Sequence, residues 1–150
     1  MKLFTSYFYQ VRHFKPWQIP LSTAMWDPHW FHDNTLDQSH KFIDKNGVLN
    51  GCRCKELVPN DDCNGLCHGK PCDFMPKSCK FLQTYRKQIF SLDKDEYLNK
   101  LYQFSIKAIK LLNLSRSPEL MLIVYESPSN TCSERTVLQE FFGCNEWTRE

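Results

Sequence analysis

The chain has 150 residues, of which 41% are hydrophobic, and a formal net charge of +2. This size and apolar content predict one compact domain, residues 1–150, with a core of its own. Because basic and acidic residues alternate along the chain, composition excludes a protein-wide basic surface, and any phosphate binding has to be local. The first residues lack a secretory signal pattern and no apolar run reaches membrane-spanning length, so we expect a cytoplasmic protein with no membrane partner.

The first predicted elements are two short strands. Residues 2–9 alternate and are rich in aromatic side chains, which is typical of a buried first strand, and a second strand is expected over 19–23. The following residues, 26–32, hold two tryptophans and two histidines. Trp30 and its neighbours could stack on a base or another flat ligand, or they could pack against the core.

Six of the eight cysteines come next, between Cys52 and Cys79, in an insertion over about residues 51–80. Glycines and prolines interrupt this insertion and supply the sharp turns that let several thiolates meet at one ion. We therefore predict a structural zinc, with an iron–sulfur cluster or a set of reduced thiols as alternatives. The predicted zinc ligands are four of Cys54, Cys63, Cys67, Cys72 and Cys79, with Cys52 and His68 as reserves.

Helices are expected after the cysteines. Residues 81–86 predict a short helix, and Asp93 with Glu96 three positions later predicts the capped start of a longer one. Apolar and small side chains recur along this longer helix at helical spacing, which indicates a core-facing stripe. The members of the stripe are Leu98, Leu101, Ser105, Ala108, Ile109 and Leu112.

A strand, a tight loop and a helix are predicted at the end of the chain. Residues 120–125 form an apolar, strand-forming run, and Thr131 with Glu134 fits the capping box of a helix that stops at Gly143. Cys132 then falls near the first helical position, where the helix dipole and a nearby arginine lower the pKa of a thiol. A small buried cysteine without chemistry is the alternative.

This junction places polar groups at the carboxyl edge of a sheet, where α/β proteins usually bind ligands. We predict Glu126, Cys132 and Arg135 as catalytic residues there, with Glu126 as general base or ribose acceptor and Arg135 as the anion contact. Glu126 could instead only pair with Arg135 or cap a turn. The predicted ligand-binding residues are Thr5, Ser6, Tyr7 and Trp30.

The order of motifs resembles the bacterial and phage family catalogued as domain of unknown function 488. In its most specific part, the closing segment, Glu126 and Cys132 match the family pattern, whereas Val124 and Ser133 stand where members have a cysteine and a histidine. The resemblance implies a compact Rossmann-like α/β fold with helices around a mostly parallel sheet, here a phage-like member with a cysteine-rich insertion. The other motifs that carry it are Thr5–Phe8, Ile19–Ser22, Pro28–Phe31, Leu57–Pro59, Leu82–Tyr85 and Tyr97.

Three functions follow from these patterns. The first is an enzyme or binder that acts on a phosphorylated ligand, a nucleotide or nucleic acid, in the cleft at the strand ends. The second is a non-catalytic adaptor whose zinc-bearing segment contacts protein or nucleic acid. The third, thiol redox chemistry between Cys132 and Cys144, ranks last because a helix of about 10 residues would hold the two sulfurs ~15 Å apart.

Overall fold

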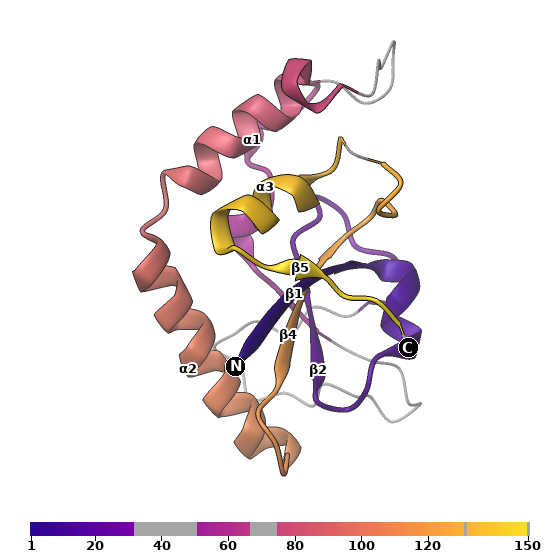
Figure 1. Cartoon of the computed structure of the whole chain (residues 1–150), viewed down its shortest axis with the longest axis vertical. Coiled ribbons are helices and arrows are strands. Elements are labelled where there is room, and N and C mark those ends of the chain that lie inside the picture. The colour runs from indigo at the N-terminus through magenta and orange to yellow at the C-terminus, as the bar shows by residue number, and fades with distance from the viewer. Residues whose placement is uncertain (32–50, 67–74, 131, 150) are drawn as a thin grey trace.

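The computed structural model describes residues 1–31, 51–66, 75–130 and 132–149. Within these residues five strands form one sheet in the order β3-β2-β4-β1-β5, and every neighbouring pair is parallel (Figure 1). The predicted α/β fold with a parallel sheet flanked by helices is therefore confirmed. The elements are β1 (Lys2–Tyr7), β2 (Gln18–Ser22), β3 (Cys52–Arg53), α1 (Lys80–Phe90), α2 (Lys94–Leu112), β4 (Glu119–Val124), α3 (Glu134–Phe142) and β5 (Asn145–Glu146).

The register of β1 and β4 decides which side chains meet at each edge of the sheet. The two strands pair residue for residue, from Lys2 opposite Glu119 to Tyr7 opposite Val124. Gln18 of β2 also lies opposite Glu119. Because the strands are parallel and in step, their amino ends share one edge and their carboxyl ends share the other, as the sequence predicted for β1 and β4.

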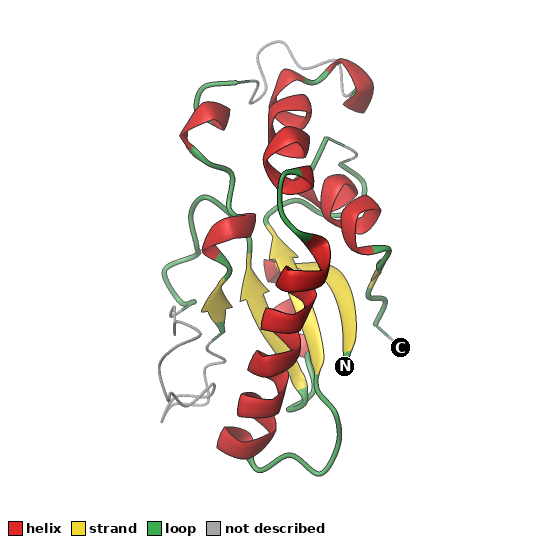
Figure 2. Cartoon of the chain, turned by 90° about the vertical axis from the view of Figure 1, so that its left-hand side faces the viewer, coloured by secondary structure: helices red, strands yellow, loops and turns green. Residues whose placement is uncertain are grey.

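The α-helices cover one face of the sheet. Figure 2 shows α2 lying along that face, and α3 packs against both α1 and β1. A 3₁₀ helix, Phe8–His13, and residues 24–31 cover the opposite face with aromatic side chains. Apolar side chains of β4 point alternately to the two faces of the sheet. Leu120 and Leu122 pack in the main core with the α-helices, and Met121 and Ile123 pack with the aromatic side chains on the opposite face. This two-sided burial explains why β4 is apolar without interruption.

The two α-helices that precede β4, α1 and α2, agree with the prediction except that α1 is longer. The side chain of Asp93 accepts a hydrogen bond from the backbone N–H of Glu96 (3.0 Å), which confirms the predicted cap of α2. Helix α1 extends beyond the predicted 81–86 to Phe90, because its buried stripe continues through Tyr85 to Ile89. None of the helices that the structure describes is both long and apolar enough to cross a membrane.

The predicted start of α3 is wrong. The N-cap is Ser133, whose hydroxyl accepts a hydrogen bond from the backbone N–H of Arg135 (3.3 Å), and Glu134 is the first helical residue. Thr131, the expected cap, lies outside the described residues. Cys132 therefore lies one residue before the cap instead of near the first helical position, where the sequence predicted it. The expected stop at Gly143 is confirmed, with a left-handed φ of 67° that a glycine adopts without strain.

Candidate functional site

A cleft opens at the carboxyl edge of the sheet, between the segments that follow β2 and β4. Its volume is about 370 Å³. One wall comes from the residues after β2, a second from Tyr125 and Glu126 after β4, and Glu134 at the start of α3 forms part of the lining. The remaining lining residues are Ala24, Met25, Trp26, Asn64 and Gly65.

The loop that carries Trp26 is held in place by charged side chains. Ser22, the last residue of β2, donates a hydrogen bond to Asp27, and Arg53 forms an ion pair with Asp27 (2.9 Å). The same guanidinium donates to the carbonyl oxygen of Ala24 (2.8 Å). Trp26 itself is 75% exposed at the rim of the cleft. A fixed loop with an exposed indole offers a preformed apolar surface beside the polar floor of the cleft.

Two carboxyl groups meet on the floor of this cleft. Ser133 donates a hydrogen bond to Glu126 (2.9 Å), which fixes that carboxylate beside Glu134. Glu134 is only 7% exposed. Burial, and next the negative charge of Glu126, raise the pKa of Glu134 from 4.5 to about 8. One member of the pair therefore carries a proton at neutral pH, and its neighbour is an acceptor for it.

Glu134 is the functional candidate that sequence reasoning missed. The sequence interpretation used it only as a capping residue, because a glutamate three positions after a threonine fits that pattern. Its position on the first turn of the helix after β4 could nevertheless have identified Glu134 as a candidate site residue. That turn and Glu126 both follow the same strand, so the two carboxylates had to lie at one edge of the sheet.

Arg135 points away from the cleft, into the layer between α3 and the strands β1 and β5. Its Nε atom forms an ion pair with Glu146 (2.5 Å), and its Nη2 atom donates to the carbonyl oxygen of Glu126 (2.6 Å). The guanidinium also lies 5.7 Å from the ring centroid of Tyr7, and the residue is 4% exposed. These contacts hold α3 against the sheet, and they leave the guanidinium out of reach of an anion.

Two of the predicted ligand-binding residues of β1 are also enclosed, whereas the third, Tyr7, is partly exposed. Thr5 and Ser6 have no exposed surface. The Thr5 hydroxyl donates to Glu146 (2.8 Å) and accepts from Gln139 (2.8 Å), so it extends the contacts of Arg135. Trp30 packs edge to face on Phe8, with 6.1 Å between the ring centroids. The geometry thus favours the packing alternative for Trp30 and an internal role for the two hydroxyls.

Neither cysteine of the predicted redox pair is arranged for exchange. Cys132 is half-buried before the cap of α3, and its backbone N–H donates to the side chain of Asn130 (3.0 Å). Burial raises the pKa of Cys144 to about 11, which keeps this thiol protonated. These observations agree with the low rank given to redox chemistry.

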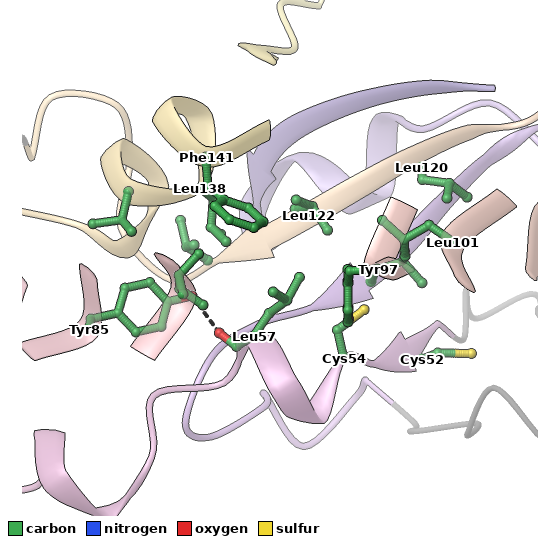
Figure 3. Close-up of a cluster of buried hydrophobic side chains, with 14 of the residues drawn as sticks. Cys52, Cys54, Leu57, Tyr85, Tyr97, Leu101, Leu120, Leu122, Leu138 and Phe141 are labelled. Atoms are coloured by element: carbon green, nitrogen blue, oxygen red, sulfur yellow. Dashed lines mark hydrogen bonds between the residues drawn. The ribbon is translucent and has the colours of Figure 1, made fainter. Parts of the chain in front are cut away.

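The predicted zinc ligands fall partly outside the described residues. Cys67, Cys72 and the reserve ligand His68 lie there, and among the residues with described positions no three metal-ligating side chains come together. Cys52 and Cys54 are packed in the main core beside Tyr97 and Leu101 (Figure 3). Burial of Cys63 raises the pKa of its thiol. The zinc site therefore stays a prediction.

Comparisons with known proteins give no match, whether with protein-family models, with curated proteins or with solved structures. The resemblance to the family of domain of unknown function 488 therefore stays a prediction. The function has to be argued from the geometry of the chain itself.

Proposed function

We propose that the cleft at the carboxyl edge is an acid–base site, in which Glu134 and Glu126 exchange protons with a small uncharged ligand. The observation that carries the proposal is that both carboxyl groups line one cavity, and that the buried one has a pKa near 8. A pair of carboxyls in different environments is a common arrangement for a general acid and a general base.

The electrostatics of the cleft argue for an uncharged ligand and against a phosphate. Besides the two glutamates, Asp27 lies close enough that its charge, after burial, helps to raise the pKa of Tyr125. Two guanidiniums are nearby and both are engaged. That of Arg53 pairs with Asp27 and donates to a carbonyl oxygen. That of Arg135 pairs with Glu146 and donates to another. An anion in this cleft would face the two glutamates, while both guanidiniums are already paired with carboxylates.

The division of roles follows from burial. Glu134 enters the reaction protonated and donates to a ligand oxygen or nitrogen, as general acid. Glu126, oriented by the Ser133 hydroxyl, accepts a proton from water or from a ligand hydroxyl, as general base. The exposed faces of Trp26 and Tyr125 hold the apolar side of the ligand.

The test is a ligand-observed NMR screen of neutral compounds that carry hydroxyl or amide groups. Compounds that bind the wild type should lose contact with Trp26→Ala. Turnover should disappear in Glu126→Gln and in Glu134→Gln, because the amide of glutamine donates a hydrogen bond as the protonated acid does but transfers no proton. Glu96→Gln, which changes an exposed glutamate on the first turn of α2, is the matched control. If Glu134→Gln turns over a bound compound as fast as the wild type does, or if no neutral compound binds, the acid–base site is refuted.

A structural zinc is the second candidate, on which the adaptor function depends. We propose Cys63, Cys67, Cys72 and Cys79 as its ligands, because Cys63 and Cys79 flank in the sequence the segment that holds the other two. Protein purified without added zinc should then carry about one equivalent of metal, and Cys72→Ser should lose it. Absence of metal together with full thiol titration of the native protein would rule zinc out.

A further inference from the structure

A second and larger cavity lies at the opposite, amino edge of the sheet. Its volume is about 870 Å³. The floor is formed where Lys2, Gln18 and Glu119 begin β1, β2 and β4 side by side. The 3₁₀ helix after β1 and the chain after β5 form the walls. We call this cavity the amino-edge groove.

Positive charge gathers in the amino-edge groove although the chain as a whole is nearly neutral. Its cationic side chains come from four separate parts of the sequence, and its two acids are already engaged. Glu146 is paired with Arg135, and Glu119 accepts from Gln18 (2.9 Å) and pairs with Arg116 (3.5 Å). The cations are Lys2, Lys15, Arg116 and Arg149, with His13 among them.

Three of these cations have no carboxylate partner in the part of the chain that the structure describes: Lys2, Lys15 and Arg149. Arg149 instead lies 3.2 Å from a ring nitrogen of His13. Partial burial, and then the charges of Arg149 and Arg12, lower the pKa of His13. The groove thus holds several cations close together without internal counterions, which favours an external anion.

Flat side chains stand among the cations. The guanidinium of Arg116 covers the ring of Trp17 at 4.4 Å from its centroid. Trp147 packs edge to face on Phe14, with 5.2 Å between centroids, and lines the groove as well. An arginine plane on an indole and a second, fixed indole are surfaces on which nucleobases stack.

The backbone holds these surfaces in place without a ligand. Trp147 donates its backbone N–H to Thr5 of β1 (2.9 Å), and Glu119 donates to the carbonyl oxygen of Trp17 (2.9 Å). Both tryptophans are therefore tied to the sheet. A preformed site needs less ordering of side chains when a ligand binds.

We propose that the amino-edge groove binds single-stranded nucleic acid, with the phosphates at Lys2, Lys15 and Arg149 and the bases against the Arg116–Trp17 pair and Trp147. The combination of a cationic groove with stacking surfaces is the one that single-strand binders use. Three cations without carboxylate partners suit several phosphates of a strand better than the phosphate of one nucleotide. The proposal is independent of the acid–base site at the other edge.

The test uses fluorescence anisotropy of labelled 12-nucleotide DNA and RNA strands at several salt concentrations. Lys2→Glu/Lys15→Glu should weaken binding about tenfold or more and reduce the salt slope by about 1.4, since each phosphate contact on a single strand contributes ~0.7. The matched control is Lys80→Glu/Lys94→Glu, which has the same charge and changes exposed lysines at the first positions of α1 and α2. It should bind within about twofold of the wild type.

Circular dichroism and thermal melts must show that both double variants are folded. Equal losses in the two double variants would show general charge attraction and overturn the site. Adenosine monophosphate or inorganic phosphate that binds as tightly as the strand would overturn the proposal in favour of a small-anion site. A wild type that binds none of the strands at low salt would refute it altogether.

Discussion

The two edges of this parallel sheet differ in charge, size and construction. The carboxyl edge holds a small cleft of about 370 Å³ whose floor is a pair of glutamates, and the amino edge holds a groove of about 870 Å³ lined by cations. In α/β folds the carboxyl edge is the usual place for anionic ligands. Of the two cavities, only the amino-edge groove is lined by cations without a carboxylate partner among the described residues. This contrast supports the proposals of an uncharged ligand at the first edge and a phosphate-bearing one at the second.

One internal ion pair connects the two edges. Arg135 lies at the start of α3 beside the carboxyl-edge cleft, and its partner Glu146 lines the amino-edge groove. Arg135 is buried, Glu146 is partly buried with 17% of its side chain exposed, and the hydroxyl of Thr5 donates to Glu146 as well. It fixes α3 and β5 against β1 and so contributes to the shape of both cavities.

The largest effect is expected from breaking this pair. Arg135→Ala leaves the partly buried carboxylate of Glu146 without its cation, which should cost on the order of 3 kcal/mol of unfolding free energy in urea titrations. Both cavities should lose their ligands, because both depend on the docking of α3 and β5. In Arg135→Ala/Glu146→Ala the loss should be smaller than the sum of the single changes. A stable Arg135→Ala variant with only a ligand defect would restore the anion-binding role predicted from the sequence.

The second-largest expected effect is a pH dependence of stability that comes from Glu134 at the carboxyl edge and leaves the amino-edge groove unchanged. The pKa of Glu134 is raised to about 8 in the folded protein from 4.5, so between those values the folded state keeps a proton that the unfolded state has released. Stability present below pH 4.5 is therefore lost as the pH rises toward 8. Glu134→Gln removes this dependence and should be more stable than the wild type at about pH 9, by an amount on the order of 4 kcal/mol.

Urea midpoints measured across this pH range provide the check. The two proteins should have similar stability at about pH 4, and Glu96→Gln should follow the wild-type curve throughout. Binding of nucleic acid at the amino-edge groove should be the same in wild type and Glu134→Gln at any one pH. Parallel stability curves for wild type and Glu134→Gln would show that Glu134 is not the protonated member of the pair.

The contrast between the edges also shows what the sequence alone could predict. The apolar run of β4, the alternation of β1 and the glycine after α3 identified the strands, their parallel pairing and the helix stop. The sequence did not reveal that Arg135 is buried, because charged residues are usually exposed and β5, which supplies its partner, has only two residues. The start of α3 was misplaced because Thr131 and Ser133 are both good capping residues.

The sequence did not predict the amino-edge groove, for a different reason. Its cations, at positions 2, 15, 116 and 149, are far apart in the sequence and sit among acidic residues. Only the register that places Lys2, Gln18 and Glu119 side by side brings them together. Local charge of this kind cannot be read from a net charge of +2, so composition required any phosphate binding to be local and could not indicate a position for it.

The smallest expected effect tests the assignment of roles within the groove. The ion pair of Arg116 with Glu119 is 3.5 Å long and the Arg116 side chain is 48% exposed, so Arg116→Gln should change the unfolding free energy by less than about 1 kcal/mol. Strand binding should nevertheless weaken several-fold, because the guanidinium plane over Trp17 is lost as a stacking surface. Arg116→Lys keeps the charge but not the plane. If Arg116→Lys binds as the wild type does, Arg116 acts only through its charge, whereas a loss equal to that of Arg116→Gln assigns it to the stacking of a base.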